Sequence, residues 1–285
     1  MSKLYFFYLK LKLINFKNIN FILFSKLYKL TKLSLFNKLS VIFTSKFKSL
    51  PFHFIYFEQI NEIVAKNHGE LDYNKKKILE IGGGNFWGLM PFFAKHNAYS
   101  HTNIDIIIDD KIINSEFVWN KFINKISAYV SEDNIKKINS FNINCKIEDL
   151  HHKELFDSVV SISCLEHIYD IESFFLSVKK HTKHNSTHLH LVNFTNHLNK
   201  NEPFKYMYTE DDKTFLKKYN TNINLLRLND YKEILNKYNF IYKIITIEKQ
   251  SVEEMKINSF WTEKYTLDEL SIKSAIIIIN GFKIK

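Results

Sequence analysis

The stretch KKILEIGGGNFWG, residues 76–88, holds four of the six glycines of this 285-residue chain. Gly82–Gly84 follow the apolar run 78–81 directly, and Gly88 comes four residues later. A glycine cluster between a buried strand and a helix lets the backbone turn sharply and approach a ligand. The start of that helix favours polar or anionic groups. The stretch therefore predicts a strand, a ligand-binding turn and a helix, with a turn needed only for packing as the alternative.

Strands and helices alternate through the rest of the chain. Short apolar runs predict strands at 75–82, 100–108, 141–149, 156–163, 187–194, 240–249 and 274–284. Amphipathic patterns predict helices at 52–68, 86–97, 115–138, 170–182 and 230–239. This alternation indicates an α/β fold, with a mostly parallel sheet covered by helices on both faces. Residues 198–226 break the rhythm, since they are long, polar and rich in aromatics, and we expect a substrate-side insert or lid there.

The positive charge of the chain is confined to its first part. The net charge is +10, yet ten lysines and no acid precede Glu58, and the other 30 basic side chains are matched by 30 acidic ones. We therefore expect a basic amphipathic, helical extension at 1–50 and one domain at 51–285. Its lysines and apolar residues fit peripheral contact with the anionic inner face of a membrane, or alternatively a cap on the domain or a partner surface. No apolar run is long enough to span a bilayer.

Other classes of protein are disfavoured by composition. Arg227 is the single arginine, so a nucleic-acid partner is not expected. The two cysteines, Cys145 and Cys164, form no CxxC pair, which favours a reducing, cytoplasmic setting over a disulfide framework. No motif for a metal site is present, and none is expected.

Three stretches together resemble class I S-adenosylmethionine-dependent methyltransferases of the small-molecule and glycan type. ILEIGGGNFWG (78–88) is similar to their first motif, in which an acid precedes a G-x-G turn. FDSVVSISCLEHIYDIESFF (156–175) is similar to their fourth-strand motif, and NLLRLNDYKEILNKYNF (224–240) to the helix after the substrate loop. The resemblance covers about residues 75–285. It implies a Rossmann-like, seven-stranded sheet with an antiparallel last strand, and S-adenosylmethionine as the cofactor.

The resemblance also implies a set of cofactor-binding residues. Gly82, Gly83 and Gly84 would line the methionine part of the cofactor, and Glu80 would orient the turn or reach the amino group. Asp105, 23 residues after Gly82, would accept bonds from both ribose hydroxyls. The remaining expected contacts lie after the third and fourth strands, at Glu148 or Asp149 and at Cys164. Two departures from the family pattern are Phe86 at the usual third glycine and Lys146 where the adenine-contacting acid is expected.

Two histidines are the candidates for a general base. An alcohol acceptor benefits from such a base, and histidine is suited to neutral pH. His167 follows the fourth strand and His197 follows the fifth, so both should face one cleft; for each, a purely structural role is the alternative. His188 and His190 alternate on the fifth strand and could help to bind substrate, and Arg227 could hold an anionic group or pair with an acid.

These expectations lead to one reading with two alternatives. The first is transfer of a methyl group to a hydroxyl of a small molecule, such as a sugar or a polysaccharide intermediate. An NAD-binding oxidoreductase is an alternative, disfavoured because Trp87 stands where the GxGxxG pattern needs its third glycine. A non-catalytic, membrane-associated scaffold with the same fold is the other.

Overall fold

A computed structural model of the chain describes residues 50–199 and 201–283. The basic extension predicted at 1–50 lies outside the described residues, apart from Leu50, where the first described helix begins. Among the described residues, no helix combines the length and the apolar character needed to cross a bilayer.

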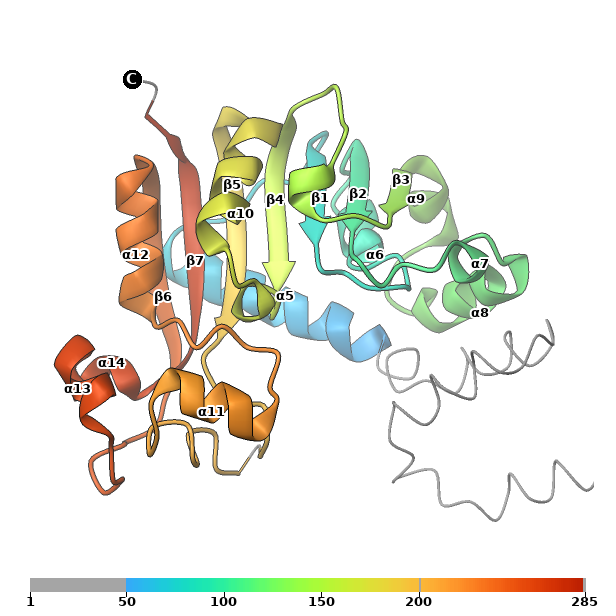
Figure 1. The fold of residues 1–285 in the computed structure, drawn as a ribbon. Coiled ribbons are helices and arrows are strands. Elements are labelled where there is room, and N and C mark those ends of the chain that lie inside the picture. Colours follow the sequence, from blue (N-terminus) through green and yellow to red (C-terminus); the bar gives the residue numbers. More distant parts are fainter. Residues whose placement is uncertain (1–49, 200, 284–285) are drawn as a thin grey trace, which may run out of the picture. The chain divides into compact units, whose positions relative to one another are not determined.

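The described part alternates strands and helices, as the sequence predicts (Figure 1). In chain order the elements are α5 (Leu50–Asn67), β1 (Lys77–Ile81), α6 (Met90–Lys95), β2 (Ser100–Ile104), α7 (Asp110–Ile113), α8 (Glu116–Ile126), α9 (Glu132–Lys137), β3 (Asn139–Ile143), the 3-10 turn η2 (Ile147–Asp149), β4 (Phe156–Ile162), the 3-10 turn η3 (Leu165–His167), α10 (Ile171–His181), β5 (Thr182–Asn193), α11 (Asp212–Tyr219), α12 (Leu228–Lys237), β6 (Phe240–Lys249), α13 (Ser259–Lys264), α14 (Leu267–Leu270) and β7 (Ile272–Phe282).

The seven strands form one sheet in the order β3-β2-β1-β4-β5-β7-β6. Strands β1 to β5 pair in parallel, and β7 lies between β5 and β6 and is antiparallel to both. The predicted seven-stranded sheet with an antiparallel last strand is thus confirmed. The parallel strands all end at one edge of the sheet, called here the carboxyl edge, where ligands of open α/β sheets bind.

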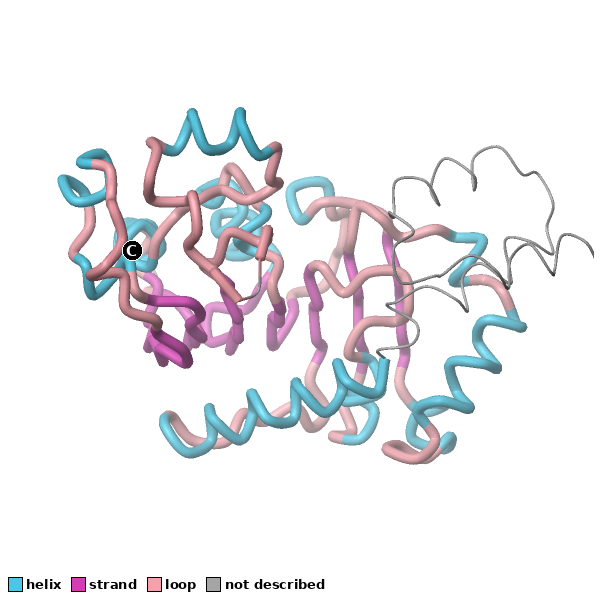
Figure 2. Tube along the Cα trace, turned by 90° about the horizontal axis from the view of Figure 1, so that it is seen from below, coloured by secondary structure: helices cyan, strands magenta, loops and turns pink. Residues whose placement is uncertain are grey.

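Helices cover both faces of the sheet (Figure 2). Helices α5, α6 and α8 pack together on one face, and α10 and α12 pack on the other. Alternate residues of β1 serve the two faces: Leu79 and Ile81 pack in the core beneath α10 and α12, whereas Glu80 points toward α6. Burial of such aliphatic side chains contributes about 1.5–3 kcal/mol each.

Two connections at the carboxyl edge fold into a separate small core. Residues 194–227 join β5 to α12, and residues 250–271 join β6 to β7. Their buried side chains form one cluster of Phe204, Met207, Tyr208, Phe215, Ile223, Leu225, Val252, Trp261, Tyr265 and Leu270. These two connections are called the lobe below.

Element boundaries differ from the predicted ones at several places. Among the strands, the one predicted at 141–149 is the shorter β3, and residues 147–149 form η2 instead. The helix predicted at 86–97 is α6 alone, because Trp87 and Gly88 have φ of +56° and +50° and Pro91 starts the helix. The helix predicted at 115–138 breaks into α8 and α9, since Ser131 caps a new helix start. The lobe contains α11, α13 and α14, which the sequence analysis did not predict.

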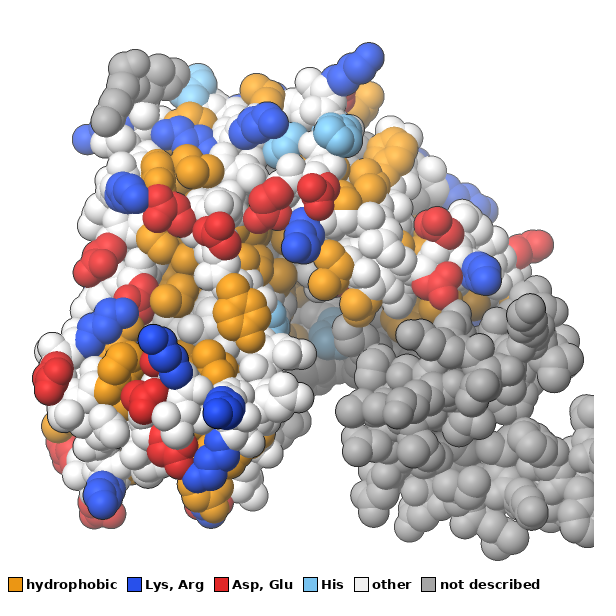
Figure 3. Space-filling view, in the orientation of Figure 1, with side chains coloured by type: hydrophobic (Ala, Val, Ile, Leu, Met, Phe, Trp, Pro, Cys, Tyr) orange, Lys and Arg blue, Asp and Glu red, His pale blue; other side chains and the backbone are white. Residues whose placement is uncertain are grey.

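Charges of both signs are mixed on the face that carries α10 and α12 (Figure 3). This mixture agrees with the balance of 30 basic and 30 acidic side chains after residue 57.

Candidate active site

The glycine turn after β1 lies at the carboxyl edge of the sheet. Gly82 and Gly84 have φ of +84° and +73°, a region that side chains disfavour. The N–H of Gly82 donates to the carbonyl of Ile104 at 2.9 Å, which ties the turn to the end of β2. A Cβ on Gly82 would lie 2.7 Å from Sγ of Cys164. Glycine is therefore required at position 82, and the turn lies directly against the segment that follows β4.

Glu80 holds the turn to the helix that follows it. Its carboxylate is buried and accepts from the N–H of Leu89 at 2.7 Å, and it lies 2.8 Å from Nε2 of His101. A Cβ on Gly83 or Gly88 would lie 2.6 Å or less from that carboxylate. These contacts favour the orienting role for Glu80 over a direct contact with a cofactor amino group.

Asp105 follows β2 and faces the glycine turn. Its Oδ2 accepts from the N–H of Gly84 at 2.9 Å, and its Oδ1 accepts from the N–H of Ile107 at 3.0 Å. A carboxylate has about four acceptor positions, so two remain after these bonds. The half-buried carboxylate is thus held in place and still has room for two hydroxyl donors.

The acidic loop follows β3, and β3 is the neighbour of β2, the strand that Asp105 follows. Glu148 and Asp149 form the exposed side of η2, and Lys146 precedes them, also exposed. Both acids thus follow the carboxyl end of β3 on a turn that packs beside α10, and no described hydrogen bond joins either side chain to Asp105 or to the glycine turn.

Cys164 lies near the carboxyl groups of Glu166, Asp105 and Glu80, all of which affect the pKa of its thiol. Burial, with smaller contributions from Glu166, Asp105 and Glu80, raises the pKa of its thiol to about 12. The thiol is therefore protonated at neutral pH and is no nucleophile. The negative charges of Asp105 and Glu80 favour a positively charged group beside the glycine turn.

Close to Cys164, one carboxylate and two imidazoles lie near one another. Ligand atoms of Glu166, His167 and His197 all lie within 4.8 Å of one another. Nε2 of His197 is 3.9 Å from Oε1 of Glu166, and the two histidine rings lie 5.1 Å apart between centroids. We call these three residues the edge cluster.

Glu166 is the unusual member of the edge cluster. It is 3% exposed, and neither carboxylate oxygen has a partner with hydrogen-bond geometry. Burial raises its pKa to about 8, although backbone N–H groups of Glu166 and Asn193 oppose this. Burial also lowers the pKa of His197, and His167 lowers it further. Both shifts favour the neutral forms of the Glu166 carboxyl and the His197 imidazole.

The lobe holds the edge cluster in place. Nδ1 of His167 is bonded to the carbonyl of Asn222, and the amide of Asn224 donates to the carbonyls of Leu165 and Ile168 at 2.8 Å. His197 itself has φ of +58°, a conformation that is uncommon for non-glycine residues and recurs at functional sites. The sequence analysis selected the two histidines but missed Glu166, which stands between Leu165 and His167 in the quoted fourth-strand motif.

Other residues considered from the sequence lie elsewhere. His188 and His190 are fully buried in the core, where Ser186 and Ser161 bond to them, so they do not line the carboxyl edge. Arg227 is 1% exposed and donates to two backbone carbonyls rather than to an acid or a ligand. Of the lobe aromatics, only Tyr206 is well exposed, and it stacks on Tyr219.

The two buried histidines predict an acid-sensitive fold. Burial lowers the pKa of His190 to about 3 and that of His188 well below its usual value. Between about pH 3 and the unfolded value of about 6.5, the unfolded chain binds more protons, so stability is full above pH 6.5 and is lost as the pH falls. Each histidine contributes a slope of about 1.4 kcal/mol per pH unit.

We therefore expect the thermal midpoint to fall steeply from pH 6.5 to 4 in wild type. A His190→Met variant should show a shallower fall, and the exposed His184→Gln variant should behave as wild type. Parallel curves for wild type and His190→Met would contradict a neutral, buried His190.

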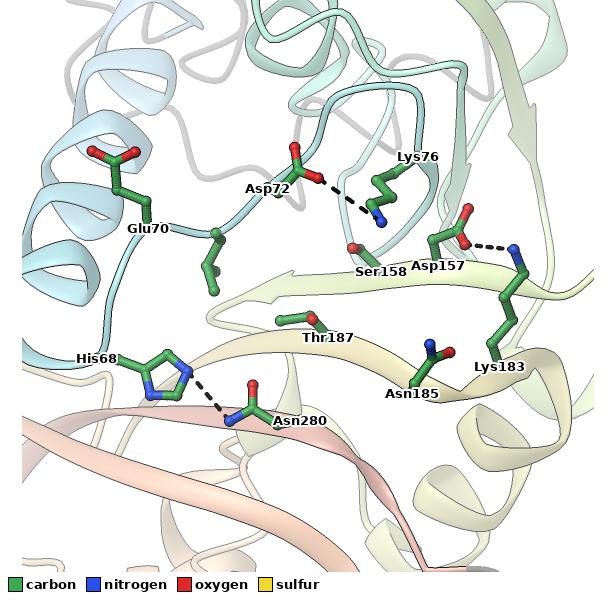
Figure 4. Close-up of a pocket in the computed structure, with 11 residues that line it drawn as sticks. His68, Glu70, Asp72, Lys76, Asp157, Ser158, Lys183, Asn185, Thr187 and Asn280 are labelled. Carbon is green, nitrogen blue, oxygen red and sulfur yellow. Dashed lines mark hydrogen bonds and ion pairs between the residues drawn. The ribbon is translucent and has the colours of Figure 1, made fainter.

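One cavity of the described part lies at the opposite edge of the sheet from the glycine turn (Figure 4). It measures about 510 Å³ and is lined mostly by polar groups near the starts of β1 and β4, with ion pairs Lys183–Asp157 and Lys76–Asp72. Because the carboxyl edge is where α/β sheets bind ligands, this cavity is not the candidate site.

Comparison with known proteins agrees with this geometry. The sequence model of a family described as a methyltransferase domain matches residues 53–242, which is more than half of the chain. The ubiquinone biosynthesis O-methyltransferase of Rickettsia akari is 30% identical over 126 residues, 44% of this chain and 43% of that enzyme. The matched part thus spans less than half the length of that curated relative.

Solved structures share the fold. The PH0226 protein of Pyrococcus horikoshii superimposes with a TM-score of 0.50 at 13% identity, covering 84% of this chain and 93% of that one. Phosphoethanolamine N-methyltransferase 2 of Haemonchus contortus, solved with S-adenosyl-L-methionine, gives a TM-score of 0.48 at 15% identity, over 79% of this chain and 53% of that one.

Proposed function

Since the chain belongs to the methyltransferase domain family and is a class I S-adenosylmethionine-dependent methyltransferase, we propose an acceptor for the methyl group. The proposed acceptor is a hydroxyl oxygen of a small molecule. Family membership argues against the NAD-binding alternative, and the methyl-transfer assay below tests the non-catalytic one. The observation that supports an oxygen acceptor is the edge cluster. It brings the carboxylate of Glu166, two residues after Cys164, together with the imidazoles of His167 and His197.

The residues at the glycine turn fit S-adenosylmethionine, the cofactor of this enzyme class. Asp105 keeps two free acceptor positions for the ribose hydroxyls, and the negative charges of Glu80 and Asp105 near Cys164 suit a cation. When bound, the cofactor supplies a methyl group on a positively charged sulfur, which a nucleophile displaces directly. We assign Gly82, Gly83 and Gly84 to the backbone that borders it.

The edge cluster can take up the proton that a hydroxyl must lose. A neutral amine attacks with its own lone pair, but a hydroxyl is a weak nucleophile until its proton is shared with a base. The base is worth about 10²–10⁴-fold in rate. His197 and His167 lie with Glu166 at the carboxyl edge, so the proton need not cross the protein to reach solvent.

The acceptor class is tested with a panel of compounds. We place sugars and glycan intermediates first, because the motif resemblance points to that branch and the exposed ring of Tyr206 offers a stacking face. Phenols come second, because the curated relative is named for ubiquinone biosynthesis. The measurement is transfer of radiolabelled methyl from S-adenosylmethionine to each acceptor. Methylation of amines alone would contradict an oxygen acceptor.

Asp105→Ala should weaken S-adenosylmethionine binding about 10-fold or more. Each hydrogen bond from a ribose hydroxyl to a charged carboxylate contributes about 1.5–3 kcal/mol, and about 1.4 kcal/mol corresponds to a factor of ten. Isothermal titration calorimetry measures the affinity, with the exposed Asp110→Ala as the control. Unchanged affinity in a folded Asp105→Ala protein would show that the ribose lies elsewhere.

Residues 1–49 are proposed to hold the protein on the anionic face of a cytoplasmic membrane. The full-length protein should sediment with vesicles of anionic lipid at low salt, because each lysine near the surface contributes about 1 kcal/mol, which salt screens. A chain that begins at Leu50 should stay in the supernatant and keep its affinity for S-adenosylmethionine. Sedimentation of both proteins, or of neither, would reject the membrane role.

A further inference from the structure

We propose that Glu166, His167 and His197 bind one divalent transition-metal cation, which holds and acidifies the acceptor hydroxyl. The inference deepens the proposed function and rests on it for the role of the cation, but not for its binding. The sequence gives no metal motif, because the three ligands come from two separate segments that only the fold brings together.

The first argument is the composition of the edge cluster. Two imidazoles and one carboxylate are the ligand set of many catalytic zinc and iron sites. Their ligand atoms lie within 4.8 Å of one another, whereas ligands about 2.1 Å from one cation lie about 3–4 Å apart. A cation therefore needs only a small approach of the side chains, and the exposed ring of His197 can make it while Asn222 holds His167.

The second argument is the state of Glu166. A carboxylate that is 3% exposed, and whose nearest backbone N–H groups do not reach hydrogen-bond geometry on either oxygen, is costly to bury. Neighbouring His197 is not close enough to bond, at 3.9 Å. A cation between them would satisfy the carboxylate and both rings at once.

The third argument is the orientation of His167. Its Nδ1 is engaged by the backbone carbonyl of Asn222, which fixes Nδ1 as the donor and leaves Nε2 as the nitrogen with a free lone pair. Metal-ligating histidines almost always donate their second ring N–H to a carbonyl or a carboxylate. The lobe thus prepares His167 as a ligand.

Three ligands leave coordination positions open, which is the arrangement of a catalytic rather than a structural metal. A hydroxyl bound at an open position loses its proton more readily, as metal-bound water does. The proton would leave to solvent, the oxygen would keep the electron pair with which it attacks the methyl carbon, and the carbon–sulfur bond would break with its electron pair left on the sulfur. In this arrangement His197 is a ligand and not a free base.

The chemistry of the site selects the cation. Imidazole suits zinc, iron, nickel and copper, whereas magnesium and calcium prefer oxygen ligands. Cobalt(II) is the probe, because its visible absorption reports coordination directly and needs no acceptor. Metal-free protein, prepared by chelation and dialysis, is titrated with Co²⁺ alone and then with Zn²⁺ as competitor.

Wild type should develop the visible bands of a low-coordinate cobalt site with one Co²⁺ per chain, and Zn²⁺ should bleach them. His167→Ala, His197→Ala and Glu166→Gln should each weaken Co²⁺ binding at least about 10-fold. His151→Ala is the control, since His151 is exposed and lies outside the edge cluster. The two alanine variants are at exposed positions, so the test survives if Glu166→Gln fails to fold.

Binding of S-adenosylhomocysteine, measured on the same samples, separates this proposal from the proposed function. Binding of S-adenosylhomocysteine without cobalt bands would overturn the metal site and leave the methyltransferase function standing. Cobalt bands without cofactor binding support the metal site and overturn the function. Bands that persist in all three variants place the cobalt elsewhere and overturn the proposal.

Discussion

A His197→Ala variant should transfer methyl groups about 10²–10⁴-fold more slowly than wild type while binding S-adenosylmethionine with unchanged affinity. The reason is geometric. Nε2 of His197 lies 3.9 Å from Glu166 and its ring 5.1 Å from that of His167. No described hydrogen bond joins its ring to the glycine turn. Its loss therefore removes activation of the hydroxyl and leaves the cofactor contacts intact.

The measurement is the initial rate at saturating S-adenosylmethionine, together with the calorimetric affinity for the cofactor. His151→Ala is the matched control, an exposed histidine outside the edge cluster. A near-normal rate in His197→Ala would show that alignment alone carries the reaction. A loss of rate that follows an equal loss of cofactor affinity would show that His197 only shapes the binding site.

Arg227→Met should lower the free energy of unfolding by about 2–5 kcal/mol. The guanidinium is buried and donates to the carbonyls of Phe194 and Ile272 at 2.8 and 2.9 Å. Methionine fills most of the space but leaves both carbonyls without a partner, and each such loss costs about 1–3 kcal/mol. The guanidinium also lies over the rings of Phe194 and Tyr208, 5.0 and 5.5 Å from their centroids.

Urea denaturation followed by circular dichroism measures the effect. Arg227→Lys is the control: a single ammonium group cannot reproduce the planar fork, so we expect an intermediate loss. Because Arg227 joins the start of the lobe to the start of β7, the Met variant should also lose activity. A change in stability below about 0.5 kcal/mol would mean that water replaces the guanidinium at both carbonyls.

The sheet could be predicted from the sequence because its signals are local. The run 78–81 followed by Gly82 fixes β1 and its turn, and the apolar run of β7 marks a strand buried on both faces. The same logic failed for His188 and His190. Their alternation correctly placed them on one face, but the two histidines lie in the middle of β5 under α10, away from its carboxyl end.

The edge cluster could only partly be predicted. His167 and His197 each follow a strand end, which is a pattern visible in the sequence. Glu166 was missed because a three-residue 3-10 turn decides which of its side chains points inward, and no periodicity reports that. Neither role expected for Arg227, holding an anionic group or pairing with an acid, is seen, because its partners are backbone carbonyls from distant segments, which leave no trace in side-chain patterns.

The position of β7 between β5 and β6 has a consequence for how the protein is made. Residues 272–282 are synthesised after both neighbours, so β5 and β6 have no partner at their facing edges while the ribosome is still translating β7. Unpaired strand edges promote aggregation, and sheets closed by distant segments form slowly. During synthesis, the very apolar strand β7 can therefore enter the gap between β5 and β6 only after both have been made. Expression at reduced temperature or with added chaperone should therefore raise the soluble yield more than any change at the active site.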